Sequence, residues 1–333
     1  MSTASKAVSL DAEGINTVKE ESPGKVVFRR FRKHKLAMIA LFVIAFVFIV
    51  SFFAQTLAPF APDAVDVSNR FAKPGTVDPI TGAPHILGTD NIGRDYFSRL
   101  LYAGRISLSV AILAVLISET IGVTVGAISG FYGGIVDAVL MRVVEFLLTI
   151  PQLPLLLIVS SMLLRNPDLL PFPDFLLNFV GKIMLLRPSD VRQALIIVII
   201  LAGLGWLGSA QIMRGMVMSL RDQTFVEAAR SLGASNSRII FLHMIPNALA
   251  PIIVSASLGL AGYIIYEASL SFLGFGIQDP IPTWGNMLSG TQAYMLDRPW
   301  LPLVPGLPIF LCSLCFNYIG DGLRDALDPR LKM

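Results

Sequence analysis

The amino-acid sequence alternates between long apolar blocks and polar intervals. The first block, residues 36–54, holds about 19 residues without a charged side chain, and a helix of that length crosses a hydrocarbon core about 30 Å thick. Later blocks predict further membrane-spanning helices at 106–129, 143–164, 194–213, 248–277 and 301–319. Pro151 and Pro154 predict a bend in the third span. The pattern therefore predicts an all-α polytopic membrane protein with six transmembrane helices.

Composition excludes the soluble classes. Of the 333 residues, 54% are hydrophobic and only 15% are charged, with a mean hydropathy of +0.69. A soluble globular chain carries about 25% charged residues. The two soluble domains that this length would allow are therefore excluded. The formal net charge of +3 says little about partners.

The charge distribution predicts the orientation of the spans. Basic residues are concentrated at 28–35, directly before the first span, and the positive-inside rule places such a cluster in the cytoplasm. A nucleic-acid-binding patch is disfavoured at this position. Residues 1–25 are polar and aperiodic, which predicts a disordered tail without a cleavable signal peptide. Six crossings then place both termini, and the polar interval 221–247, in the cytoplasm.

The interval 221–247 has the pattern of a compact, exposed knob. Its apolar residues recur at helical spacing and are Phe225, Ala228, Ala229 and Leu232. Gly233 follows where a helix that must stop favours a residue with positive φ. A second helical run, 236–241, leads to Pro246. Two short helices that meet at a glycine are therefore expected.

The same interval carries a motif. Glu227-Ala228-Ala229 is followed after three residues by Gly233, and after nine more by the string HMIP at 243–246. Between membrane spans, this pattern resembles the EAA loop of the inner-membrane permease subunits of ABC importers. In that family the loop is cytoplasmic and forms the coupling helix, which docks into a groove on the ATPase subunit. The His form of the motif is typical of the peptide and nickel branch.

The resemblance implies which residues couple the chain to an ATPase: Phe225, Glu227, Ala228, Ala229, Arg230, Leu232, Gly233 and Ala234. By this resemblance Glu227 and Arg230 make polar contacts at the docking surface. The alanines keep the helix thin, and Gly233 sets the angle between the two short helices. Helix solubility and plain helix propensity remain open as simpler explanations of the charged residues and the alanines.

Two further strings resemble the oligopeptide, dipeptide and nickel permeases. They are residues 87–95, LGTDNIGRD, which resemble the segment before the core permease domain, and residues 320–330 near the C-terminus. The resemblance thus covers about residues 28–330. Three charged residues of the first string are expected in a surface loop with helix caps: Asp90, Arg94 and Asp95.

The implied architecture is the type I ABC importer permease fold. Its expected regions are a cytoplasmic tail at 1–35, a first transmembrane helix with a long extracytoplasmic segment at 36–104, and a core permease domain at 105–333. Residues 165–192 are longer than the link expected between the third and fourth spans. The short apolar run 175–186 in this insertion predicts an extracytoplasmic amphipathic or re-entrant helix.

Two carboxylates, Glu119 and Glu267, fall inside predicted spans. A charge at mid-bilayer costs roughly 2.5–3.5 kcal/mol on insertion scales, so each must face the bundle interior, a water-filled path or a partner. Each residue either lines the translocation pathway or makes an interhelical hydrogen bond, and both alternatives stay open. Small residues in the second and fifth spans allow close or sliding helix contacts: Gly122, Gly126, Gly130, Ser255, Ser257, Gly259 and Gly262.

Motifs for catalysis are absent from the sequence. It contains no Walker A string, no His-Glu-x-x-His and no Gly-x-Ser-x-Gly. His34, His85 and His243 are too scattered for a metal site. Cys312 and Cys315 have helical spacing in the last block, which is typical of core or lipid-facing residues rather than a redox pair. We therefore predict a non-catalytic subunit that binds neither cofactor nor metal.

The resemblance implies a subunit of a binding-protein-dependent ABC importer in the bacterial or archaeal cytoplasmic (inner) membrane. Its implied partners are a homologous permease, two ATPase subunits (identical or different) that hold ATP and Mg, an extracytoplasmic solute-binding protein and the lipid bilayer. No nucleic acid is implied. The expected cargo is an oligopeptide or dipeptide, with nickel or another small solute such as an oligosaccharide as the alternative. A secondary transporter is disfavoured because no inverted repeat is found.

Overall fold

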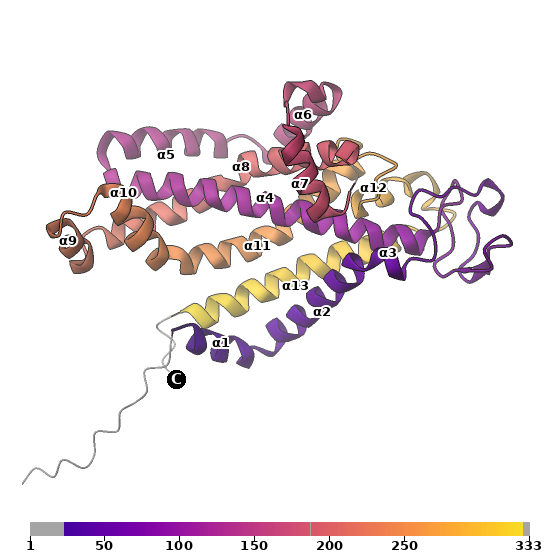
Figure 1. The fold of residues 1–333 in the computed structure, drawn as a ribbon, viewed down its shortest axis with the longest axis horizontal. Coiled ribbons are helices and arrows are strands. Elements are labelled where there is room, and N and C mark those ends of the chain that lie inside the picture. Colours follow the sequence, from indigo (N-terminus) through magenta and orange to yellow (C-terminus); the bar gives the residue numbers. More distant parts are fainter. Residues whose placement is uncertain (1–22, 187, 329–333) are drawn as a thin grey trace, which may run out of the picture.

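The structure, a computed structural model, describes residues 23–186 and 188–328 as an elongated helical bundle (Figure 1). Among these residues, five helices are long and apolar enough to cross a membrane. They are α2 (Lys35–Phe52), α4 (Tyr96–Tyr132), α8 (Pro188–Leu220), α11 (Ile245–Phe272) and α13 (Leu303–Leu327). A sixth candidate span is the bent pair α5 (Gly134–Leu148) and α6 (Gln152–Arg165). This architecture is compatible with the predicted count of six.

The second span is longer than the apolar pattern predicts. Helix α4 begins at Tyr96 rather than at residue 106, because protein covers its first turns and Arg99 there is only 2% exposed. A polar side chain that is buried in protein does not have to end a helix. At its other end α4 runs to Tyr132, past the predicted end at residue 129, and the following turn is made by Gly133 and Gly134, which both adopt positive φ.

The third span is broken rather than gently bent. Helix α5 begins at Gly134 instead of residue 143, and α5 and α6 meet at an angle of 89°. Pro151 stands at this break as the N-cap of α6. Pro154 lies in the first turn of α6, where a missing N–H breaks no intrahelical bond. The predicted bend therefore belongs to Pro151, and Pro154 takes no part in it.

The basic residues before the first span are helical. Helix α1 (Pro23–Lys33) is separated from α2 by His34, whose Nδ1 accepts a hydrogen bond of 3.1 Å from the amide of Ala37. Phe31 is buried, and it lies beside Gly322 of α13. The tail predicted to be disordered through residue 25 thus becomes helical at Pro23, and residues 1–22 lie outside the described part of the chain.

The closest helix contact in the bundle joins α4 to α8. Three glycines of α4 lie one turn apart along it: Gly122, Gly126 and Gly130. An added Cβ at each would lie within 3.0 Å of a carbonyl oxygen of α8, and those oxygens belong to Trp206, Ala210 and Arg214. Small residues at this spacing let two helix backbones touch. The core of the bundle forms around this pair: α11 packs against both helices, and α13 packs against α11 and α2.

An ion pair closes one end of the α4–α8 contact. The guanidinium of Arg214 on α8 holds the carboxylate of Asp137 on α5 in two hydrogen bonds of 2.5 and 2.6 Å. The hydroxyl of Ser129 on α4 donates a third bond of 2.5 Å to the same carboxylate. Asp137 therefore connects three helices just after the turn between α4 and α5.

The long segment between α2 and α4 contains short elements: α3 (Ala54–Leu57), η1 (Val67–Asn69), and a two-stranded antiparallel sheet of β1 (Thr76–Val77) and β2 (Pro84–His85). This small sheet is a departure from the all-α prediction. The surface-loop prediction for the string 87–95 is also wrong in part. Asp95 does cap α4, accepting a bond of 2.7 Å from the amide of Ser98. However, Asp90, Arg94 and Asp95 are all less than 10% exposed.

Burial of the string 87–95 has an electrostatic cause. Arg94 pairs with Asp90 at 2.6 Å and with Asp279 at 2.9 Å, and Arg99 pairs with the same oxygen of Asp279 at 2.8 Å. Burial disfavours the charged form of Asp279, but the cations of Arg99 and Arg94 outweigh it and lower its pKa below the ordinary 3.8. The cluster joins the segment between α2 and α4 to the loop that precedes α12 (Trp284–Ser289) and η4 (Gln292–Tyr294).

The insertion 165–192 contains η2 (Pro167–Leu169) and the helix α7 (Asp174–Met184). One face of α7 is buried through Leu177, Val180 and Met184, whereas Phe175 and Phe179 are 74% and 62% exposed. Helix α7 is thus amphipathic, and its position outside the membrane stays a prediction.

We expect Gly126→Val to weaken the α4–α8 contact. The added side chain would overlap the carbonyl of Ala210, and overpacking of a tight contact costs about 1–3 kcal/mol. The thermal midpoint of the purified protein should fall. Gly203→Val on α8 is the control, because no atom lies within 4 Å of an added Cβ there. Equal midpoints for the two variants would contradict the assignment of this contact.

We expect Asp279→Asn to loosen the segment between α2 and α4, because buried Arg99 loses its charged partner at a cost of about 1–3 kcal/mol. Asp168→Asn is the control, since Asp168 is 95% exposed in its pair with Arg192 and such pairs contribute at most about 1 kcal/mol. The measurement is hydrogen exchange in the string 87–95.

The effect of Asp279 should depend on pH in a defined direction. Because the folded protein lowers the pKa of Asp279, its stabilising contribution is complete above the ordinary 3.8 and is lost as the pH falls through the lower folded value. The difference in exchange between the wild type and Asp279→Asn should therefore shrink below about pH 3.8. A difference that grows on acidification would contradict the assignment.

Candidate coupling segment and membrane groove

The interval 221–247 begins with helix α9 (Thr224–Ser231), which ends in a glycine turn. The amide of Gly233 donates to the carbonyl of Arg230 at 3.0 Å, and the amide of Ala234 donates to the carbonyl of Ala229 at 3.1 Å. This pair of bonds is the Schellman arrangement, which requires positive φ at the residue after the helix. Gly233 has a φ of 79° and open space where a Cβ would lie. The backbone conformation, rather than crowding, therefore requires glycine here.

The interior contact of α9 is made by a residue that the sequence pattern did not single out. Val226 is fully buried and packs in one cluster with Met213 and Val217 of α8 and Met244. Three residues of the predicted apolar stripe face the opposite way, whereas the fourth, Ala229, is partly buried against this cluster. Leu232 is 88% exposed, and Phe225 and Ala228 are also exposed. Either face of a short helix can pack against the rest of the protein, and periodicity alone did not identify which face of α9 does so.

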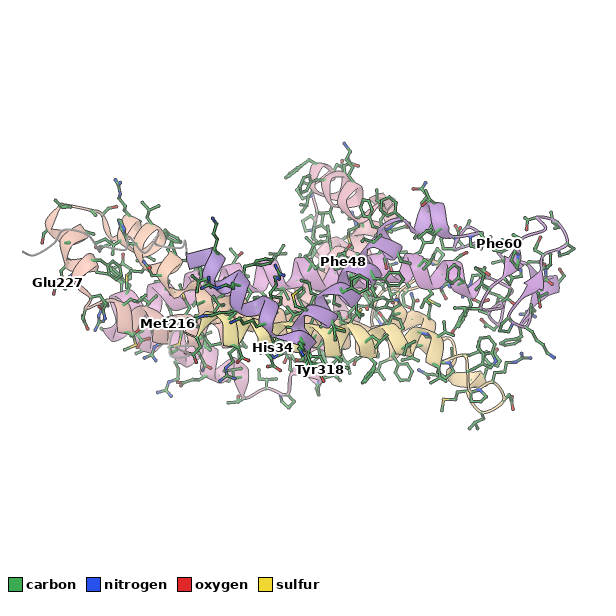
Figure 2. All side chains as sticks on the ribbon, turned by 90° about the horizontal axis from the view of Figure 1, so that it is seen from below. His34, Phe48, Phe60, Met216, Glu227 and Tyr318 are labelled. Atoms are coloured by element: carbon green, nitrogen blue, oxygen red, sulfur yellow. The ribbon has the colours of Figure 1, made fainter. Side chains whose placement is uncertain are left out.

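The exposed face of α9 borders an open hollow of about 530 Å³, lined by Phe225, Ala228, Ala229, Leu232, Gly233, Ala234, Arg238 and His243. The predicted coupling residues Glu227 and Arg230 are exposed beside it. Glu227 lies near one end of the molecule and Phe60, in the segment between α2 and α4, near the other (Figure 2). The structure thus presents the predicted coupling residues as an unpartnered surface at one end of the bundle.

The second predicted short helix does not stand apart. Helix α10 (Asn236–Arg238) continues through a π-helical stretch, η3 (Ile239–Met244), directly into α11. Residues 236–272 therefore form one continuous span candidate. The hydroxyl of Ser235 caps its start. Only the turn at residues 232–235 therefore separates α9 from this continuous helix.

Glu267 on α11 has its hydrogen-bonding needs met inside the bundle. It is fully buried, and its two carboxylate oxygens accept bonds from Ser107 on α4 at 3.0 Å and from Ser271 at 2.8 Å. The hydroxyl of Ser107 also accepts a bond of 3.2 Å from the amide of Trp284. This geometry favours the interhelical hydrogen bond over the pathway role for Glu267.

Glu119 on α4 has a different environment. Its side chain is only partly buried, and within it the oxygen Oε2 is enclosed and has no hydrogen-bond partner among the described residues. Glu119 lines a cavity of about 180 Å³, which we call the membrane groove. Its lining residues come from α4, α6, α8 and α11 and are Glu119, Gln152, Gly205, Gly208, Ser209, Ser255, Gly259, Gly262, Tyr263 and Tyr266.

Small and polar residues shape the membrane groove. The hydroxyl of Tyr263 donates to Ser118 at 2.7 Å, and an added Cβ on Gly205 would overlap the Tyr263 ring, so Gly205 makes room for it. Gly208 and Gly262 have no atom within 4 Å of an added Cβ. Glycines therefore serve two purposes in this bundle: those of α4 bring backbones together, and these two leave space open.

Sequence reasoning missed most of the groove. Gln152, Ser209, Tyr263 and Tyr266 are polar groups inside apolar helices, as Glu119 is, and the hydroxyl of Tyr266 donates to Gln152 at 2.9 Å. Their common face could have been found only with the packing of four helices known. Within residues 23–186 and 188–328, no group of three or more His, Cys, Asp or Glu side chains is placed to hold a metal ion. Cys312 and Cys315 are buried free thiols.

Comparison with known families decides the class. The family described as "Binding-protein-dependent transport system inner membrane component" matches residues 122–333, which include α9 and every lining residue of the membrane groove except Glu119. The chain belongs to this family. The description "N-terminal TM domain of oligopeptide transport permease C" matches residues 22–74. The resemblance to ABC importer permeases that the EAA-type motif indicated is thereby confirmed.

Individual relatives of this permease cover nearly its whole length. The dipeptide transport system permease protein DppC of Alkalihalophilus pseudofirmus is 37% identical over 93% of this chain and 91% of its own length. The oligopeptide transport system permease protein OppC of Haemophilus influenzae is 38% identical over 91% and 87%. The OppC protein of Bacillus subtilis is 34% identical over 97% and 94%. The chain is thus a multi-pass membrane permease, a transport subunit without a catalytic role of its own.

Proposed function

We propose that this permease imports oligopeptides or dipeptides as part of a binding-protein-dependent ABC importer. The observation that carries the proposal is that relatives named as dipeptide and oligopeptide permeases match more than 90% of the chain. The exposed α9 surface supports it, because a permease without a nucleotide-binding motif must receive its motion from another subunit. The partners we propose are a homologous permease, two ATPase subunits that bind ATP and Mg, and an extracytoplasmic solute-binding protein.

The proposed orientation places α9 in the cytoplasm and the segment between α2 and α4 outside. The two lie at opposite ends of the bundle (Figure 1). The basic helix α1 precedes the first span, as the positive-inside rule requires of a cytoplasmic N-terminus. Both ends of the chain are then cytoplasmic, and the solute-binding protein delivers cargo to the opposite end.

In the proposed mechanism, α9 carries motion from the ATPase pair to the spans. Its exposed apolar face, with Phe225, Ala228 and Leu232, docks on the ATPase, while Val226 fixes it to α8. ATP-driven closure of the ATPases displaces α9, and the continuous helix from α10 through α11 passes the displacement into the membrane. The pathway then alternates between inward-open and outward-open states, which requires different contacts of α9 in the two states.

The membrane groove supports a proposal for the side of the bundle that lines the pathway. A partly unsatisfied carboxylate is costly against lipid, and Glu119 shares this face with serine, tyrosine and glutamine side chains. We therefore assign this face to the pathway between the two permeases, with Glu119 on it.

Uptake by proteoliposomes tests the cargo. Vesicles that contain the complete importer and its binding protein should accumulate labelled tri-alanine when ATP is supplied to the ATPase side, and should not accumulate ⁶³Ni²⁺ or labelled maltotriose. A complex in which ATP is replaced by a non-hydrolysable analogue is the control. Accumulation of nickel or the sugar without the peptide would overturn the proposed cargo while leaving the importer class intact.

We expect Ala228→Trp to abolish substrate-stimulated ATP hydrolysis, because the exposed position of Ala228 admits the larger side chain in the free permease but not against a docked partner. Gly233→Val should have the same effect, since positive φ costs a β-branched residue roughly 1–2 kcal/mol and the glycine turn would change. Both variants should remain in the membrane.

The matched control for the coupling experiment is Ala228→Ser, which keeps the small volume and should retain stimulated turnover. ATP hydrolysis by the reconstituted importer is measured with and without the loaded binding protein. If Ala228→Trp and Gly233→Val complexes keep full stimulated hydrolysis, α9 is not the coupling element.

A further inference from the structure

We propose that the membrane groove binds the positively charged amino terminus of a peptide in transit, and that Glu119 is its counter-charge. This inference rests on the proposed function, because it takes the groove to lie on the peptide pathway. It assigns a chemical class of ligand, an ammonium group, to the membrane groove described above.

The first argument is the uncompensated charge of Glu119. Its oxygen Oε2 is enclosed by the bundle without a hydrogen-bond partner among the described residues, while the residue as a whole is only partly buried and lines the groove. A buried polar atom that lacks a hydrogen bond is costly, and a buried carboxylate more so. No Lys, Arg or His side chain lines this groove in the described part of the chain. The counter-charge is therefore expected from outside this chain, as a cation that enters the groove beside the carboxylate.

The second argument is the match between an ammonium group and the remaining acceptors. An ammonium group has three N–H donors and no acceptor. The groove offers the carboxylate of Glu119 together with the hydroxyl oxygens of Ser209 and Ser255, which lie 3.4 Å from each other. Acceptors grouped around one carboxylate suit a point charge with several donors. A neutral sugar hydroxyl would leave the carboxylate without a counter-charge.

The third argument is the size of the groove. Its volume is about 180 Å³, comparable to roughly six water molecules at about 30 Å³ each. This space holds the first residue of a peptide rather than the whole molecule. Because Gly208 and Gly262 present no side chains, the groove offers little that could select among peptide side chains. It would recognise the group that peptides with free amino termini share.

The contrast with Glu267 strengthens the assignment. Both carboxylates lie in spans, but Glu267 is fully buried and each of its oxygens has a hydroxyl donor within the chain, whereas Glu119 is only partly buried and lines a cavity. A carboxylate needed only to join helices would be satisfied as Glu267 is. The exposure of Glu119 to the groove therefore points to a ligand that comes and goes.

The test uses the complete importer in nanodiscs, without binding protein or nucleotide, so that selection by the binding protein plays no part. Retained labelled tri-alanine is displaced with unlabelled tri-alanine or with its desamino analogue, propionyl-Ala-Ala. In the wild type, tri-alanine should displace the label at a concentration at least about tenfold lower than the analogue. A ratio of this size corresponds to the free energy of about one charge-assisted hydrogen bond. Glu119→Gln should reduce this ratio to near one.

Two matched variants serve as controls for the displacement test. Glu145→Gln removes the same charge from an exposed position on α5 and should keep the wild-type ratio. Gly208→Leu fills the groove without meeting any atom within 4 Å of its Cβ and should abolish retention, whereas Gly203→Leu, which has the same open surroundings but does not line the groove, should not.

Three outcomes would overturn the proposal. The wild type retains no tri-alanine, or Glu119→Gln keeps the wild-type ratio, or Glu119→Gln lowers the yield of the two-permease complex while the surviving complex keeps the ratio. The last outcome would identify a cation of the partner permease as the partner of Glu119. Failure of the proposed function is a separate result: the wild-type importer, given its binding protein and ATP, would accumulate no peptide in proteoliposomes.

Discussion

The backbone contact between α4 and α8 is the constraint on which the rest of the bundle depends. With glycine at three successive turns of α4, the carbonyls of α8 come closer than any side chain would allow. Two helices in such contact cannot slide without lifting the glycines off the carbonyls. They therefore form a rigid frame, and the Asp137–Arg214 pair adds α5 to one end of it. Relative motion in the protein has to take place against this frame rather than within it.

In the proposed mechanism, the rigid frame explains how the short helix α9 can act on the membrane-spanning helices. Helix α8 leads through residues 221–223 into α9, and Val226 fixes α9 back onto α8. On its other side α9 is followed, after the Gly233 turn, by one uninterrupted helix that ends at Phe272. In the coupling mechanism that we propose, a force on the exposed face of α9 is divided between the frame and α11. Because α11 carries Tyr263 and Tyr266, its movement relative to α8 would change the width of the membrane groove.

How much of this could be predicted from sequence depended on whether the cause was local. The spans followed from apolar length, and the stop of α9 followed from Gly233, since both causes lie within a few residues. The partners of Arg94 did not, because Asp279 is 185 residues away along the chain. The predicted surface loop became a buried cluster for that reason. Likewise, periodicity identified the stripe of Phe225 and Leu232, but the choice of Val226 as the interior contact depends on where α8 lies.

The same distinction separates the two carboxylates, which the sequence presented as equivalent. Glu119 and Glu267 each interrupt an apolar helix, and insertion cost alone treats them alike. Their difference lies in the neighbours that folding brings: serine hydroxyls for both oxygens of Glu267, and a cavity with open glycines beside Glu119. A hydrogen-bonded buried group holds helices in register, and satisfying it fully removes its capacity to bind anything else. The carboxylate that the bundle leaves without a full set of partners is therefore the one to which we assign a response to a passing charge.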